Sequence, residues 1–341
     1  MAAPAVETQT VTVAEAEAVR HALLPLTERV LRRLPHPRIL WVVLWASVWP
    51  LGALIIPRLL PSSATVVDEG AAESLTTMYG ALIALFGTAK LTRDLETIAP
   101  TIRSLTGGTA DPTQVFHGVG SIVWPVILTG VMLMMWTGPL VLQHQGITAL
   151  VTSAWGYMTW LPMVVLAWTA GTVLLGLNRL GGLPLHLRPF EDDRSLGLRP
   201  LGSLAFTPFL ILVGINLPLL IFAPVDLRDV ALNVGTLLLG VVLLFASLLR
   251  LRRQMLAAKA TQVAWARGLY SQAVRGVRAD GSLGGPQTMG RELAASESLE
   301  RHAAAIQEWP FEEGILRVMA AILTSLVTAI LARLVLSRLG L

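Results

Sequence analysis

Four long apolar runs that contain no charged residue dominate this sequence. They are Val119–Leu142, Leu150–Leu177, Leu204–Phe222 and Val230–Leu249. The hydrocarbon core of a bilayer is crossed by about 20 apolar residues in a helix, so each run has the length or near-length of a membrane span. A surface helix of a soluble domain would instead alternate apolar positions with charged ones. The runs therefore predict an all-α, polytopic membrane protein.

The composition agrees with this fold class and excludes several functions. Only 14% of the 341 residues are charged, against about 25% in soluble globular chains. The chain has no cysteine, which excludes disulfides, thiol catalysis and cysteine-ligated metals. Arginine outnumbers lysine so strongly that we expect a GC-rich bacterial source. Most basic residues flank apolar runs and form no nucleic-acid motif, so no nucleic-acid partner is expected.

Ile39–Leu60 is a further clear span, since its one charge, Arg58, lies near its end and can reach the headgroups. Two more segments are candidate spans, each with an alternative. Ala71–Lys90 begins with Glu73 and hydroxyl residues and, taken alone, could be an interfacial or re-entrant helix. Ile315–Leu336 has an uncharged centre, but arginines near its outer end leave open an amphipathic helix along the inner surface.

The distribution of basic residues decides the predicted topology, because cytoplasmic loops are enriched in Lys and Arg. Basic clusters precede the first span, precede the 119–142 run, and follow the 150–177 and 230–249 runs. They can all be cytoplasmic only if Ala71–Lys90 also crosses. We therefore predict about seven spans, a cytoplasmic N-terminus and a location in the bacterial cytoplasmic membrane. The clusters are Arg29, Arg32, Arg33, Arg38; Lys90, Arg93, Arg103; Arg179, Arg188, Arg194, Arg199; and Arg250, Arg252, Arg253.

Four parts of the chain follow from this topology. Residues 1–37 form a cytosolic amphipathic segment, with a helix expected from about Thr12 to Leu34. Residues 38–249 form the transmembrane bundle, with spans near 39–60, 71–90, 119–142, 150–177, 204–222 and 230–249. Residues 250–308 form a cytosolic helical hairpin, and residues 309–341 form an elbow and the last span.

The hairpin is predicted from a reversal of charge. Residues 250–278 are basic and contain no acidic residue, and their apolar positions recur at helical spacing. This helix should continue directly from the preceding span. A breaker at residues 280–286 precedes a mainly acidic stretch from Arg291 to Glu308, so the two helices are expected to pair antiparallel. The alternative is that the basic helix lies against anionic lipid headgroups.

Trp309, Pro310 and Phe311 form a candidate membrane-entry elbow before the last span. Pro310 disfavours helix at Trp309 and can restart a helix at its own position. Trp309 and Phe311 are residue types typical of the headgroup level. The alternative is a hinge that couples the hairpin to the last span.

A polar loop between two spans is the densest cluster of chemical groups outside the hairpin. Its carboxylates and histidine could hold a divalent cation, and its arginines a phosphate or lipid headgroup. The spacing matches no established motif, and a solvated loop with paired charges is the simpler interpretation. We therefore assign no metal ligand. The residues are His186, Arg188, Glu191, Asp192, Asp193, Arg194 and Arg199.

The membrane interior offers little chemistry. No Asp, Glu, Lys or Arg lies near the middle of a clear span, where pumps and proton-coupled transporters usually keep such groups. We therefore expect no catalytic residue and no cofactor there. Asn216 and Asn233 are the candidate intramembrane polar residues, and hydrogen bonds between helices are their expected role.

Three function hypotheses remain open. The first is a channel-like or ligand-sensing protein that forms a homo-oligomer. The second is a membrane scaffold or regulator acting through the hairpin, and the third is an enzyme acting on a lipid headgroup at the His186–Arg199 loop. The expected partners are the bilayer, anionic headgroups and further copies of the chain. The layout resembles that of insect-chemoreceptor-type channels in topology alone, which implies a pore lined by the last helix.

Overall fold

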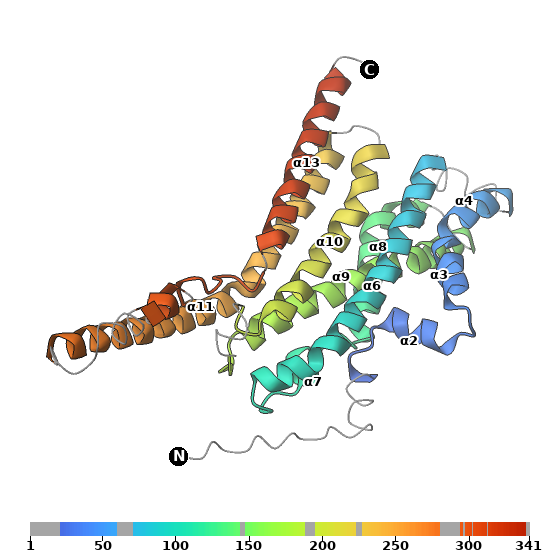
Figure 1. Cartoon of the computed structure of the whole chain (residues 1–341). Coiled ribbons are helices and arrows are strands. Elements are labelled where there is room, and N and C mark those ends of the chain that lie inside the picture. Colours follow the sequence, from blue (N-terminus) through green and yellow to red (C-terminus); the bar gives the residue numbers. More distant parts are fainter. Residues whose placement is uncertain are drawn as a thin grey trace. The chain divides into compact units, whose positions relative to one another are not determined.

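The computed structural model is all-helical, with 83% helix and no strand among the described residues. It describes residues 21–59, 71–143, 147–187, 195–222, 227–279, 294–295, 297–301, 303–311 and 313–338. Figure 1 labels the helices in chain order. They are α2 (Leu26–Arg33), α3 (Arg38–Ala46), α4 (Val48–Leu59), α6 (Ala71–Leu105), α7 (Pro112–Val115), α8 (Val123–Gln143), α9 (Ile147–Leu180), α10 (Arg199–Phe222), α11 (Leu227–Ala279) and α13 (Glu313–Arg338).

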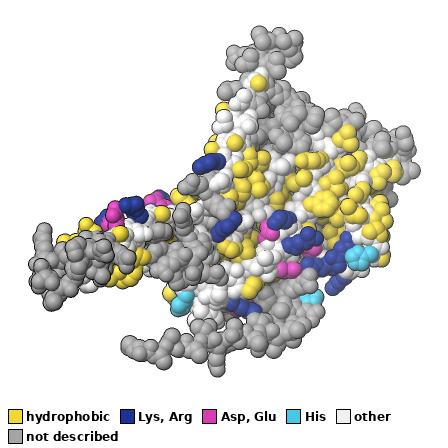
Figure 2. Space-filling view, viewed as in Figure 1, with side chains coloured by type: hydrophobic (Ala, Val, Ile, Leu, Met, Phe, Trp, Pro, Cys, Tyr) yellow, Lys and Arg dark blue, Asp and Glu magenta, His cyan; other side chains and the backbone are white. Residues whose placement is uncertain are grey.

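Three helices in the described part of the chain are long and apolar enough to cross a membrane. They comprise Ser153–Leu180, Arg199–Asn216 and Asn233–Gln272, and they coincide with three of the four charge-free runs. Apolar side chains gather on the outer surface of the helices (Figure 2). Leu238 and Val242 of α11 are 58% and 61% exposed. Extended exposed apolar surfaces are unusual in soluble proteins, so these helices indicate membrane association.

Among the described residues, the other predicted spans are not confirmed as membrane-crossing helices. Val123–Met135 of α8 and Gly314–Ser325 of α13 are shorter apolar stretches within the described residues. The predicted 71–90 segment is the first part of α6, a helix of 35 residues. It continues past Lys90 because Leu91, Leu95 and Ile102 are all buried, so that packing stabilises the helix well beyond its most apolar section.

The first predicted span is divided into two helices. α3 ends at Ala46, Ser47 caps it, and α4 begins at Val48. The cause lies in Pro50, which has no N–H to donate to the carbonyl of Ala46 and whose ring clashes with that carbonyl. At the break, the Ser47 hydroxyl donates to the carbonyl of Val43 at 2.7 Å.

The predicted N-terminal helix is also shorter than expected where it is described. Residues 1–20 lie outside the described part of the chain. α2 begins only at Leu26, after Pro25, which adopts an extended conformation at the helix start. Proline is tolerated at the start of a helix but not in its interior, so the predicted Thr12–Leu34 helix is interrupted there.

The helices group into two compact units. The first comprises Met1–Ala99 and Asp111–Val173, and the second Pro100–Ala110 and Leu174–Leu341. In the first unit, Leu31 of α2, Val42 of α3 and Leu85 of α6 form one buried cluster. The indole of Trp45 donates to the carbonyl of Met158 on α9 at 2.9 Å. These contacts join α2, α3, α6 and α9 within that unit.

In the second unit, α13 runs antiparallel to the apolar half of α11. Phe311, just before α13, contacts Phe245, and Ile322, further along α13, packs at Leu237. Figure 1 shows the two helices side by side over this stretch. α11 itself is continuous over 53 residues, which confirms the predicted continuity between the apolar run and the basic stretch.

Candidate functional site

The second half of the hairpin, described at residues 294–295, 297–301 and 303–308, is paired with α11 by opposite charges. We call it the returning segment. Arg267 Nε lies 2.9 Å from a Glu300 carboxylate oxygen, and Lys259 Nζ lies 3.4 Å from Glu308. The pairing order is antiparallel, because the later residue on α11 meets the earlier residue on the returning segment. The predicted charge pairing is therefore present between these residues. Such exposed pairs contribute about 0.2–1 kcal/mol each, so they set register more than stability.

Apolar contacts accompany the ion pairs. Ile306 of the returning segment is buried together with Leu196, and Leu299 and Ala258 pack against them. Leu196 lies in the turn before α10 at a positive φ of 56°. The returning segment thus packs on both α11 and the chain that leads into α10.

The elbow residues are packed against α11 by their aromatic rings. Trp309 and Phe311 stack with centroids 6.3 Å apart, and Phe245 of α11 meets Trp309 edge-on at 5.1 Å. Phe311 is 3% exposed. Phe311 is therefore covered by protein and not by lipid headgroups, while Trp309 stays partly exposed. These contacts fit the hinge alternative for Phe311 better than simple membrane anchoring.

A cation lies against this aromatic cluster. The Arg252 guanidinium carbon is 4.7 Å from the centroid of the Trp309 ring, and its Nη2 atom is 3.9 Å from Glu308. Its Nε atom is buried and makes no hydrogen bond with the described residues. A cation over an indole gains about 0.5–2 kcal/mol, more when it is desolvated. Arg252 thus links α11, the end of the hairpin and the elbow.

The start of α10 approaches the elbow backbone closely. A Cβ added at Gly202 would overlap the carbonyl group of Pro310. Pro310 is itself buried. Only a residue without a side chain allows this approach, so Gly202 fixes the distance between α10 and the elbow.

The end of α9 is joined to α11 at the same level. Asn178 donates to the carbonyl of Ala246 at 3.1 Å, and Gln254 donates to the carbonyls of Gly181 and Leu183 at 2.9 and 2.6 Å. Helix ends leave carbonyls without intrahelical partners, and Gln254 satisfies them at the end of α9. We call the set formed by these contacts and the elbow the junction; its members are Asn178, Gly181, Gly202, Phe245, Arg252, Gln254, Glu308, Trp309, Pro310 and Phe311.

The structure places the ends of the predicted polar loop but not its centre. His186 is exposed, and its backbone N–H donates to the carbonyl of Leu105 at the end of α6. Arg199 is the first residue of α10. Arg188, Glu191, Asp192, Asp193 and Arg194 lie outside the described residues. The headgroup-enzyme hypothesis therefore stays a prediction, and loss of a membrane-lipid phenotype on triple alanine substitution of the three carboxylates would test it.

Asn216, one of the two predicted intramembrane amides, contacts its own helix. Asn216 is buried and donates to the carbonyl of Leu212, one turn earlier on its own helix, at 2.8 Å. Asn233 is part-buried on α11. The expected bond between helices is instead made by Asn178, which lies at a helix end. The carbonyl four residues earlier is within reach of the Asn216 amide, so this bond needs no group from another helix.

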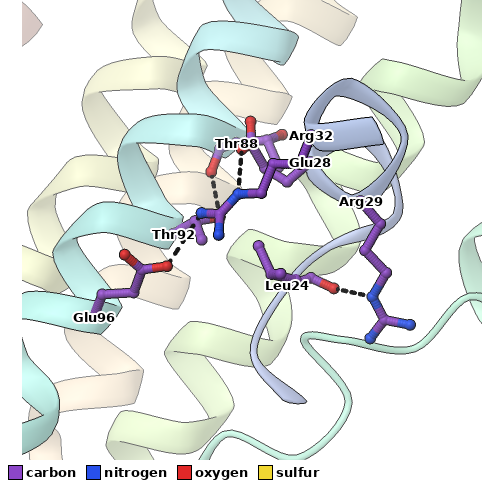
Figure 3. Close-up of polar contacts among 7 residues, drawn as sticks. All are labelled: Leu24, Glu28, Arg29, Arg32, Thr88, Thr92 and Glu96. Atoms are coloured by element: carbon purple, nitrogen blue, oxygen red, sulfur yellow. Dashed lines mark hydrogen bonds and ion pairs between the residues drawn. The ribbon is translucent and has the colours of Figure 1, made fainter. Parts of the chain in front are cut away.

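A second polar cluster, in the first unit, was missed from the sequence. Arg32 of α2 bonds to Glu96 of α6 at 3.1 Å and lies 3.7 Å from Glu28 (Figure 3). Thr88 and Thr92 of α6 are buried beside it and donate to backbone carbonyls of their own helix. The i, i+4 spacing of Glu28 and Arg32 was a signal in the sequence. No spacing pattern indicated Glu96 as a partner of Arg32, because it lies 64 residues away.

Burial raises the pKa of the Glu28 carboxyl, and the positive charge of Arg32 offsets part of that shift. An acid whose pKa is raised in the folded state stabilises the fold below its unfolded pKa, near 4.3. That stability is lost as pH rises through the folded pKa. Replacing Glu28 with glutamine removes this loss. The melting temperature of the variant minus that of wild type should therefore increase as pH rises from about 4 to 7. Glu297→Gln, at an exposed position, is the control, and a flat difference across this range would contradict the prediction.

Comparison with known proteins gives no relative: no family model, curated protein or solved structure matches this chain.

Proposed function

We propose that the chain crosses the bacterial cytoplasmic membrane seven times with its N-terminus inside. Three observations support the orientation of the second unit. Arg179 lies in the last turn of α9, Arg199 begins α10 and Arg250 follows the apolar half of α11, and the junction holds these three parts of the helices together. α13 then runs back along the apolar half of α11, which fits a last span directed outward better than a helix on the inner surface.

Cysteine labelling tests this topology, because the chain has no cysteine of its own. In intact cells, a membrane-impermeant maleimide should modify Asp226→Cys, the residue that precedes α11 in the sequence, and not Gln272→Cys. Permeabilised cells should show both modified. Modification of Gln272→Cys in intact cells would overturn the proposed orientation.

We further propose that the protein senses a ligand or partner through its hairpin and transmits the change to α13. The observation that carries this proposal is the junction, where Glu308 at the end of the hairpin contacts Lys259 and Arg252 of α11. Arg252 also contacts Trp309, which precedes Pro310, and α13 begins three residues after Pro310, at Glu313. A rearrangement of the hairpin therefore changes contacts that position the start of the last helix.

The test places a reporter on α13 and a perturbation in the hairpin. Thr328→Cys in proteoliposomes carries an environment-sensitive fluorophore. Glu308→Arg removes both ion pairs, and we expect it to shift the emission of the reporter. Glu297→Arg is the matched control, because Glu297 contacts Arg301 on its own helical segment. Equal spectra for wild type and Glu308→Arg would contradict coupling.

A channel-like homo-oligomer is the second candidate, favoured by one face of α13. Hydroxyl and small side chains line an open hollow of about 630 Å³ there: Ala321, Thr324, Ser325, Thr328 and Ala332. Small and hydroxyl residues allow close helix packing in membranes and also suit a wet pore. Purified protein that stays monomeric and gives no ion flux in liposomes would remove this candidate.

A further inference from the structure

The second half of α11 carries a row of basic side chains on one exposed face. Arg250, Arg253 and Arg275 are all exposed. At 100° per residue they fall, together with Ala257 and Ala264, within an arc of roughly 60°. We call these five residues the basic face. The opposite side of the helix holds Leu251, Met255 and Ala266, all fully buried.

The described acidic residues of the returning segment do not pair with the basic face. Glu300 contacts Arg267, and Glu308 contacts Lys259 and Arg252. Glu297 contacts Arg301 within its own segment. Within the described residues, no acidic side chain is paired with Arg250, Arg253 or Arg275. Among the described residues, the hairpin thus pairs the charges on one side of α11 and leaves three arginines on the other side without an acidic partner.

The composition of the basic face suits a layer of phosphate groups. The guanidinium group of arginine binds phosphate oxygens through paired hydrogen bonds. Ala257 and Ala264 between the arginines are short, so they allow the helix to lie close to a flat surface. Trp265 borders the face and is 48% exposed, and tryptophan is enriched where protein meets headgroups.

The position of the face along α11 selects a membrane rather than another partner. Arg250 is the first charged residue after the apolar run 230–249, and it lies beside Gly181 at the end of α9. The basic face therefore begins at the boundary of a candidate span. Figure 1 shows α11 changing direction between its apolar half and its basic half. The basic half thus departs from the direction of the span.

From these observations we infer that the basic face lies on the headgroups of the cytoplasmic leaflet and binds anionic phospholipid. The inference rests on the proposed crossing by α11. Electrostatic attraction to an anionic leaflet is short-ranged and weakened by salt. Each arginine removed should therefore lower the apparent affinity for anionic lipid roughly fivefold, and removal of all three should lower it on the order of a hundredfold.

The test uses the full chain in nanodiscs with one reporter. Ala264→Cys carries a bimane label, and a headgroup spin-labelled lipid quenches it when the basic face is at the surface. Discs contain phosphatidylcholine with increasing phosphatidylglycerol. We expect quenching to rise with the anionic fraction and to fall at high salt. Arg253→Gln should require more phosphatidylglycerol for half-maximal quenching, and Arg250→Gln/Arg253→Gln/Arg275→Gln should lose the response.

Arg267→Gln is the matched control, since it removes one positive charge that is paired with Glu300 and lies off the face. It should respond like wild type. Equal quenching with and without phosphatidylglycerol, or equal loss in Arg253→Gln and Arg267→Gln, would overturn the inference. Equal quenching with and without phosphatidylglycerol would instead favour an acidic protein partner for the basic face. The hairpin coupling is measured separately at residue 328, so the two proposals can fail independently.

Discussion

Replacing Gly202 with alanine is expected to destabilise the purified protein by about 3 kcal/mol or more. The added Cβ would overlap the carbonyl group of Pro310, and two backbones must separate to admit it, because no flexible side chain can move aside. Thermal unfolding in detergent, followed by tryptophan fluorescence, measures the change.

Gly235→Ala is the control for this substitution. Gly235 also lies within a helix, and nothing lies within 4 Å of a Cβ built there. Alanine in a helix interior is better than glycine by about 0.5–1 kcal/mol, so this variant should be as stable as wild type or more stable. If the two variants have the same melting temperature, α10 does not approach the elbow as closely as the structure shows.

Replacing Phe311 with alanine is expected to cost about 3–5 kcal/mol, the usual effect of truncating a buried aromatic side chain. Phe311 is 3% exposed and contacts Phe245, Trp309 and the start of α10 at Gly202. Its loss leaves a cavity at the point where these segments meet. The same unfolding measurement applies, and Phe311→Leu should recover a large part of the loss because it refills most of the volume.

Phe86→Ala provides the comparison, because Phe86 is 50% exposed on α6. Removing its ring leaves no internal cavity, so a change well below that of Phe311→Ala is expected. A Phe311 variant as stable as the Phe86 variant would mean that the elbow is a loose membrane anchor and not a packed junction. The proposed coupling between hairpin and α13 would then lose its structural basis.

The sequence predicted well those features that depend on neighbouring residues. Charge-free runs such as Leu150–Leu177 indicated membrane helices because hydropathy acts over a single helix. The unbroken passage from the apolar run into the basic stretch of α11 followed from periodicity and the lack of a breaker. The complementary charges of residues 250–308 predicted an antiparallel pairing, and Arg267–Glu300 and Lys259–Glu308 are observed.

Two breaks between helices had local causes that were present in the sequence. Pro50 removes the hydrogen bond that would have carried the first helix past Ala46, and Pro25 separates α2 from the residues before it. Hydropathy alone does not detect either break, because both prolines lie in stretches that stay suitable for a helix on average.

Only the tertiary structure decided which distant residues meet. Glu96 lies 64 residues from Arg32, and Gly202 lies far along the chain from Pro310. Neither pairing has a signature in sequence spacing, because each depends on how whole helices pack. The apolar runs, acting through hydropathy, determined that this chain forms helices long and apolar enough to cross a membrane. The packing of Phe311, Arg252 and Gly202 decided that its elbow is a junction, since side-chain shape and backbone distance act only once the helices are in place.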